Sequence, residues 1–205
     1  KQKTAYEMCG RDWSSDVCSS DLNAQGNTPV LSPDGRWLAF YRGTDIWVMQ
    51  IGEDSVPRRL IDDQNLQALA AFSPDGRWLA YASSETGDFE IYVRPFPDVS
   101  SGKQQVSVEN GFGAVWSRSV REIFFVDGTS LLVSDVTPGP EIAFSVPRPL
   151  FSTEGLEAVS NGFDVSPDGR RFLFVRKATA DSGDPTEQLI LVQNFAEDLK
   201  AKVPD

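Results

Sequence analysis

Four copies of one short pattern constrain the fold of this 205-residue chain more than any other feature. The pattern reads Ser-Pro-Asp-Gly-Arg-Trp-Leu-Ala followed by an aromatic residue, and it begins at Ser32 and again at Ser73. Eroded copies begin at Ser117 and Ser166, so the spacings are 41, 44 and 49 residues. Repeats of about 40 to 50 residues are typical of propeller blades with four strands each.

Each complete copy predicts a tight turn between two strands. Proline fixes φ at the first central position, aspartate bonds to nearby backbone, and glycine accepts the left-handed conformation that follows. Apolar residues precede and follow the turn, as expected for paired strands. We therefore expect a structural role for the turn residues, which are Ser32, Pro33, Asp34, Gly35, Ser73, Pro74, Asp75, Gly76, Ser166, Pro167, Asp168 and Gly169.

The third copy departs from the pattern. It reads Ser117-Arg118-Ser119-Val120-Arg121, so valine stands where the other copies have glycine. A branched Cβ is poorly tolerated in the left-handed region. We therefore expect this turn to be of another type, or to be strained.

Residues 1–22 have no counterpart in the repeats. Residues 12–22 read Asp-Trp-Ser-Ser-Asp-Val-Cys-Ser-Ser-Asp-Leu, which resembles a translated short-read sequencing adapter, and the first seven residues resemble its other arm. We expect this segment not to be native, and residue 23 to mark the break in a longer protein; the alternative is a linker rich in serine and aspartate. Cys9 and Cys18 both fall within it, so cysteine predicts neither a disulfide nor a metal site.

Apolar runs supply further strands in each repeat. Third strands are predicted at 45–49, 90–93, 131–134 and 189–192, and fourth strands at 58–61, 104–107 and 148–151. The expected fold is all-β: a partial propeller of about four blades of four antiparallel strands over residues 23–195, part of a six-bladed whole. A tail, 196–205, follows, and residues 195–202 could form a short amphipathic helix.

The second repeat continues as Asp88-Phe89-Glu90-Ile91-Tyr92-Val93-Arg94-Pro95-Phe96-Pro97. Together with the turn pattern, this stretch resembles the WD-like repeat of the TolB-like six-bladed propellers. The phrase Tyr-Val-Arg-Pro-Phe-Pro is especially similar to propellers at the C-terminus of bacterial serine/threonine protein kinases. That resemblance implies a cytoplasmic kinase, often a membrane helix, and then a propeller in the periplasm or at the cell surface.

The residues needed for common catalytic sites are missing from the sequence. The chain has no histidine, which removes a Ser-His-Asp triad and histidine metal sites. A Gly-x-Ser-x-Gly elbow is absent, and the lone Gly111-Phe112-Gly113 reads as the beginning of an inner strand. Asp34, Asp75 and Asp168 could be considered as calcium ligands, but the turn role suits them better. We therefore predict no catalytic, cofactor-binding or metal-binding residue, no cofactor and no enzymatic activity for this segment.

Charge and hydropathy narrow the partners. With 30 acidic and 19 basic residues the net charge is −11, which argues against a nucleic-acid partner. No apolar run approaches the roughly 20 residues of a membrane helix, so we expect no membrane contact. A protein or a small ligand is expected at the loops between blades, because rigid scaffolds place recognition on loops. Candidate loops are Arg42 to Asp45, Ser83 to Asp88, Pro97 to Lys103 and Lys177 to Glu187.

Three functions fit this sequence. The first is a non-catalytic binding or sensing propeller, the C-terminal module of a bacterial serine/threonine kinase. The second is a freestanding periplasmic TolB-like protein that binds envelope proteins. The third is the propeller of a serine peptidase whose catalytic domain lies outside this segment.

Overall fold

The computed structural model describes residues 28–53, 56–119, 121–139, 141–154, 156, 163–177 and 187–192. All regular secondary structure in these described residues is β-strand, as predicted. Segment 1–22, Val120 and the tail 196–205 lie outside the described residues, so the predictions made for them stay predictions. The described residues contain no helix of the length and apolar character that spanning a membrane requires.

The first two repeats form one four-stranded antiparallel sheet each, with strands in chain order. The strands of the first sheet are β1 (Val30–Leu31), β2 (Trp37–Arg42), β3 (Asp45–Gln50) and β4 (Arg58–Arg59). Those of the second are β5 (Gln67–Phe72), β6 (Trp78–Ser83), β7 (Glu90–Pro95) and β8 (Gln104–Gln105). In both sheets the repeated turn joins the first strand to the second.

The third and fourth repeats form the remaining sheets. The third sheet has β9 (Phe112–Trp116), β10 (Glu122–Val126), β11 (Ser130–Thr137), β12 (Ala143–Phe144) and β13 (Arg148–Ser152). Here β13 pairs with the first half of β11, and β12, which we did not predict, pairs with its end. The fourth sheet has β14 (Phe163–Val165), β15 (Phe172–Lys177) and β16 (Glu187–Val192).

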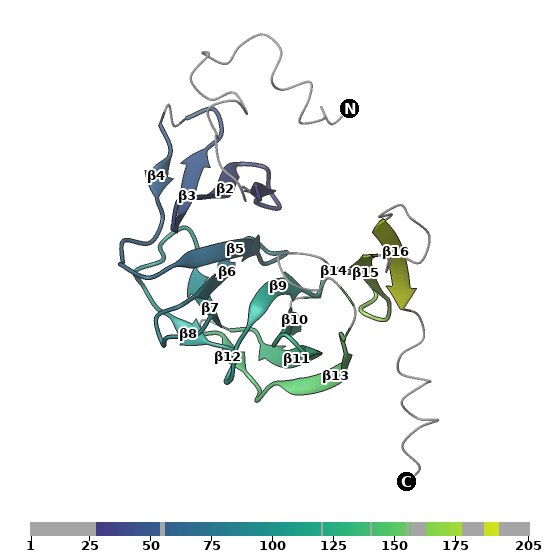
Figure 1. The fold of residues 1–205 in the computed structure, drawn as a ribbon. Helices are drawn as coiled ribbons and strands as arrows, with labels where there is room; N and C mark the ends of the chain where they lie inside the picture. Colours follow the sequence, from purple (N-terminus) through teal and green to yellow (C-terminus); the bar gives the residue numbers. More distant parts are fainter. Residues whose placement is uncertain are drawn as a thin grey trace.

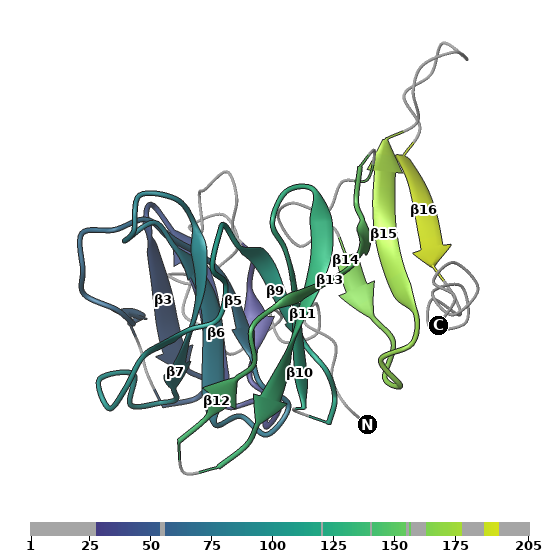
Figure 2. The ribbon, with the colours of Figure 1, turned by 90° about the horizontal axis from the view of Figure 1, so that it is seen from below.

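The four sheets follow one another around an arc, and β5, β9 and β14 line its inner side (Figure 1). The inner strands contact one another in sequence, β1 with β5, β5 with β9, and β9 with β14. Seen at right angles, the sheets stand side by side, and the β14–β15 turn lies at one end of the fourth sheet (Figure 2). The predicted all-β partial propeller is therefore confirmed.

In the second sheet, alternate side chains of the central strand β6 point to opposite faces of the blade, and both faces are buried. All six residues of β6 are buried. Leu79 and Tyr81 pack toward the first sheet, whereas Trp78, Ala80 and Ala82 pack toward the third. Successive side chains of a strand point to opposite faces, so a blade with a neighbour on each side needs an apolar run without polar interruptions.

The contact between the third and fourth sheets is mainly aromatic. Phe174 of β15 meets Phe151 of β13 edge-on, with ring centroids 5.7 Å apart. Phe172 meets Phe124 and Phe151 edge-on, with centroids 5.2 and 5.6 Å away. Such geometries are the ones that aromatic pairs prefer, and they add to the stabilisation from apolar burial.

Candidate functional site

Each Ser-Pro-Asp-Gly turn is closed by the serine. Ser73 Oγ accepts a hydrogen bond from Trp78 N–H (3.0 Å) and donates one to Asp75 Oδ1 (2.6 Å). The Ser73 carbonyl accepts from Gly76 N–H (2.8 Å), and Gly76 has φ +70°. Asp75 Oδ1 also accepts from Arg77 N–H (3.1 Å). The aspartate therefore holds the turn together.

The same bonds recur in the turns at Ser32 and Ser166. Hydrogen bonds from the Ser32 hydroxyl and then from the N–H of Arg36 lower the pKa of Asp34. Ser166 and Arg170 lower the pKa of Asp168 in the same way. Among the described residues no group of three acidic, cysteine or histidine side chains could hold a metal ion.

The third turn keeps the serine but replaces the aspartate contacts. Ser117 Oγ accepts from Glu122 N–H (3.0 Å), as its counterparts do, and also from Arg121 N–H (3.2 Å). Its hydroxyl lies 3.2 Å from that of Ser119, which stands at the aspartate position. Ser117 thus accepts the hydrogen bond from the arginine N–H that the aspartate accepts in the other turns.

The repeated turns lie at the same end of the strands in each sheet, and turns of neighbouring sheets approach one another. A Cβ placed on Gly76 would lie 3.9 Å from Pro33 Cδ, and one on Gly169 would lie 3.6 Å from Glu122 Oε2. We call the surface that these turns form the turn face, defined by the described residues 32–36, 73–77, 117–119, 121 and 166–170. Since the strands are antiparallel, the predicted loops Arg42 to Asp45 and Ser83 to Asp88 lie at the opposite end.

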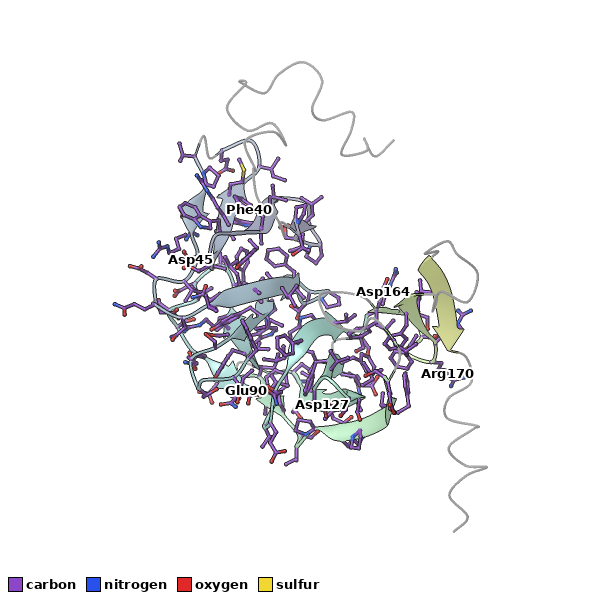
Figure 3. The ribbon with its side chains drawn as sticks, viewed as in Figure 1. Phe40, Asp45, Glu90, Asp127, Asp164 and Arg170 are labelled. Atoms are coloured by element: carbon purple, nitrogen blue, oxygen red, sulfur yellow. The ribbon has the colours of Figure 1, made fainter. Side chains whose placement is uncertain are left out.

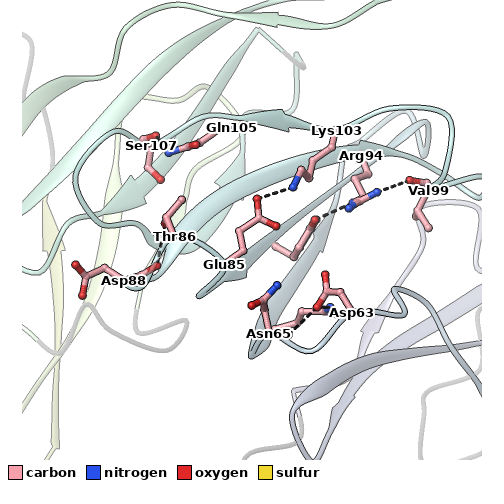
Figure 4. A network of polar contacts seen from close by, with 12 residues as sticks. Asp63, Asn65, Glu85, Thr86, Asp88, Arg94, Val99, Lys103, Gln105 and Ser107 are labelled. Carbon is pink, nitrogen blue, oxygen red and sulfur yellow. Dashed lines mark hydrogen bonds and ion pairs between the residues drawn. The ribbon is translucent and has the colours of Figure 1, made fainter.

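The structure brings two of the four predicted loops together. Lys103 Nζ, at the end of Pro97 to Lys103, is 2.5 Å from Glu85 Oε1 in Ser83 to Asp88 (Figure 4). The same ammonium lies 4.9 Å from the centre of the Tyr92 ring. The middle of the predicted loop Lys177 to Glu187 lies outside the described residues.

Arg94 fixes the loop Pro97 to Lys103 against the second sheet. Its Nε donates to Tyr81 Oη and its Nη1 to the carbonyl of Val99, both at 2.8 Å (Figure 4). Burial raises the pKa of Tyr81. Burial and the nearby Glu85 carboxylate raise the pKa of Tyr92 to about 12. Both phenols therefore stay protonated at neutral pH and do not supply a general base.

A buried acid that the sequence reasoning missed holds the outer edge of the second sheet. Glu90, 5% exposed, accepts hydrogen bonds from the Ser107 hydroxyl and from Asn110 N–H. The Ser107 hydroxyl also accepts from Ile91 N–H at 2.7 Å. Asp45 opens β3 as Glu90 opens β7, and both are labelled in Figure 3. Aligning the repeats could have revealed this shared acidic position.

The adjacent acids Asp62 and Asp63 differ from each other. Asp62 is a surface carboxylate whose Oδ1 lies 3.0 Å from Arg59 Nη1. Asp63 Oδ1 accepts hydrogen bonds from Asn65 N–H (3.0 Å) and from the Gln67 amide (2.8 Å). The two do not form a pair of facing carboxylates suited to acid–base catalysis.

A cleft of about 320 Å³ opens between the inner strands. Its walls are almost entirely apolar and include Leu31, Phe72, Val115, Trp116 and Phe163. Trp116 Nε1 donates to the carbonyl of Ala71 (3.1 Å), which joins the second and third sheets at the cleft wall. The cleft offers shape and apolar contact but no group for chemistry.

Neither a family model nor a curated protein matches the chain. Solved structures do resemble it: TolB from Acinetobacter baumannii is 18% identical over 84% of this chain and 42% of its own, with a TM-score of 0.60. The chain has a β-propeller fold similar to that of TolB. An auxiliary nutrient binding protein from Bacteroides thetaiotaomicron is 12% identical over 82% of this chain and 45% of its own, with a TM-score of 0.55.

An enzyme shares this TolB-like fold. An oligogalacturonate lyase in complex with manganese is 15% identical over 82% of this chain and 48% of its own, with a TM-score of 0.54. The chain spans less than half the length of each of these three structures. At such identities the likeness concerns the fold alone, because one fold hosts many functions.

Proposed function

We propose that this chain is a non-catalytic binding propeller, the sensor or interaction module at the C-terminus of a bacterial serine/threonine kinase. It lies outside the cytoplasm and binds a protein or a small ligand at the connections between blades. The kinase association is supported by the phrase Tyr-Val-Arg-Pro-Phe-Pro at residues 92–97. The binding role is supported by the fold, which one protein named for binding also has.

The observation that carries the binding role is the coupling of two loops on the second sheet. The Glu85–Lys103 ion pair joins them, and Arg94 anchors the second loop to a tyrosine of β6. The Glu85 side chain is 18% exposed and the Lys103 side chain is 35% exposed. Loops held in place before binding lose less entropy when a partner docks.

The acids and phenols around these loops favour binding over catalysis. The two buried tyrosines have raised pKa values, and the turn aspartates Asp34 and Asp168 have lowered ones. Neither kind of group changes its proton near neutral pH, where a general acid or base is most effective. We expect no kinase, esterase or peptidase turnover from the purified chain, and measurable turnover would contradict the proposal.

A second candidate is a freestanding TolB-like envelope protein, which the likeness to TolB favours. Reading the gene upstream of this segment separates the two. The kinase proposal predicts a catalytic domain followed by a membrane span and then the propeller. A signal peptide directly before the propeller would overturn that proposal in favour of the second candidate.

A further inference from the structure

The turn face carries the same positively charged residue in every repeat. An arginine stands four residues after the turn's serine in every copy, at Arg36, Arg77, Arg121 and Arg170. All four arginines are exposed. Arg170 is labelled on the fourth sheet in Figure 3. Arg118 adds a second cation to the third turn. The proposed loops Arg42 to Asp45 and Ser83 to Asp88, at the other end of the strands, do not include these side chains.

The turns differ in how far this charge is offset. Arg36 Nε lies 3.8 Å from Asp34 Oδ2, and Arg77 Nη2 donates to the carbonyl of Gly139 (3.2 Å). The guanidinium groups of Arg118 and Arg121 have no ion pair or hydrogen bond with any other residue that the structure describes. Ser119 replaces the turn aspartate there, so the third turn is the most positive of the four.

The fourth turn lies directly beside the third. Gly169 approaches the start of β10, where its missing Cβ would be 3.6 Å from Glu122 Oε2. Arg170 follows Gly169 and Arg121 precedes Glu122, so the two arginines flank this contact. Arg170 and Arg121 are thus next in sequence to the two residues of this contact, in which Glu122 contributes one carboxylate.

Charge is distributed unevenly over the rest of the molecule. The connections at the opposite end are rich in acids, namely Asp62, Asp63, Glu85, Asp88, Glu109 and Asp127. The turn face holds five arginines against the aspartates Asp34, Asp75 and Asp168, so it has a net charge of +2 in a chain whose net charge is −11. Such a surface selects and orients a partner of opposite charge.

We propose that Arg118 and Arg121, with Arg170 beside them, bind an acidic segment of a protein partner. This inference rests on the proposed binding function and adds the face used and the chemistry of the partner. The planar guanidinium group binds a carboxylate through two parallel hydrogen bonds, which a lysine does not offer. A short acidic segment contacts the positive end alone, whereas a phosphate polymer or an anionic membrane would also meet the acidic remainder of the chain.

The test uses a fluorescein-labelled peptide of ten glutamates, with a ten-lysine peptide as its control, followed by fluorescence anisotropy. We expect the glutamate peptide to bind, whereas the lysine peptide binds only the acidic connections and is not weakened by charge reversal on the turn face. The double substitution Arg118→Glu/Arg121→Glu should weaken binding by roughly tenfold or more, since like charges then oppose the peptide. Binding should also weaken as salt rises, because exposed charges are screened.

Two further variants separate a local site from general electrostatics. Arg58→Glu/Arg148→Glu changes net charge equally but alters exposed residues of β4 and β13, and it should change affinity less than about twofold. Ser119→Asp restores the aspartate of the other turns and should weaken the peptide by a few-fold while the turn still folds. Thermal unfolding of each variant checks that the fold is kept.

Several results would overturn the inference. An equal loss of affinity in both double variants would mean that only net charge matters. Binding of anionic vesicles or DNA without binding of the peptide would point to phosphate. If the chain binds another ligand and Arg118→Glu/Arg121→Glu leaves that binding unchanged, the inference fails while the proposed binding function stands.

Discussion

Replacing Ser73 by alanine removes the hydroxyl that closes the turn of the second sheet. Ser73 is 0% exposed and Trp78 is 5% exposed, so the Trp78 N–H loses its acceptor where water does not replace it. An unpaired buried N–H costs about 1–3 kcal/mol. Asp75 also loses a hydrogen bond, but it is exposed and water restores that bond at little cost. We expect Ser73→Ala to lower the free energy of unfolding by about 2 kcal/mol.

Ser83 is the matched control. It lies in β6 of the same sheet and is also 0% exposed, but its hydroxyl has no hydrogen-bond partner among the described residues. Burying a hydroxyl without a partner costs about 1–3 kcal/mol in proteins. Ser83→Ala should therefore leave the free energy of unfolding unchanged or raise it by up to about 1 kcal/mol.

Urea unfolding followed by tryptophan fluorescence measures both variants. With a slope of about 2 kcal/mol per molar urea, Ser73→Ala should move the midpoint down by about 1 M while the slope stays constant. Ser83→Ala should not lower the midpoint. Equal losses in the two variants, or no loss in Ser73→Ala, would refute the hydrogen-bond reasoning for the turn.

Three further predictions concern the turns and the contact between blades. Gly76→Ala should lower the free energy of unfolding by about 1–2 kcal/mol, because φ is +70° at this position. Gly102→Ala should be nearly neutral, since its Cβ would meet only ordinary contacts at 3.9 Å, and thermal unfolding compares the two variants. Leu79→Ala, fully buried between the first two sheets, should cost about 2–5 kcal/mol, and Leu31→Ala, 48% exposed, about 0.5 kcal/mol or less in the same urea assay. Folding lowers the pKa of Asp34 below 3.8, so its carboxylate stabilises the folded state fully above that pH, and this stabilisation is lost as pH falls through the folded pKa. Asp34→Asn should therefore make the free energy of unfolding less sensitive to acid below pH 3.8. An unchanged acid titration of stability would contradict this.

The sequence was sufficient to predict the strands that repeat. Serine, proline, aspartate and glycine each have a local reason to occupy their turn positions, and apolar runs mark strands that pack on both faces. The strand β12 escaped because two residues, Ala143 and Phe144, show no alternation. Its pairing depends on the end of β11, which extends beyond the partner strand β13.

The polar contacts of the candidate site were beyond such reasoning. Glu85 and Lys103 are 18 residues apart in the chain, and Tyr81 and Arg94 are 13 apart. Strand alternation assigns a side chain to one face of a sheet, but it does not say which distant polar group it meets there. The third turn shows the same limit: its sequence predicts an altered turn, but not that Ser117 takes over the bond to Arg121 N–H.

Amide hydrogen exchange tests the central claim most directly, namely that the sheets are stacked blades with the second enclosed on both faces. All six residues of β6 are buried between the first and third sheets. Amides in the most enclosed elements open only with the whole domain and exchange slowest. The arrangement predicts that β6 amides exchange more slowly than those of β2 and β15. Exchange of β6 as fast as that of β15 would contradict the stacked arrangement.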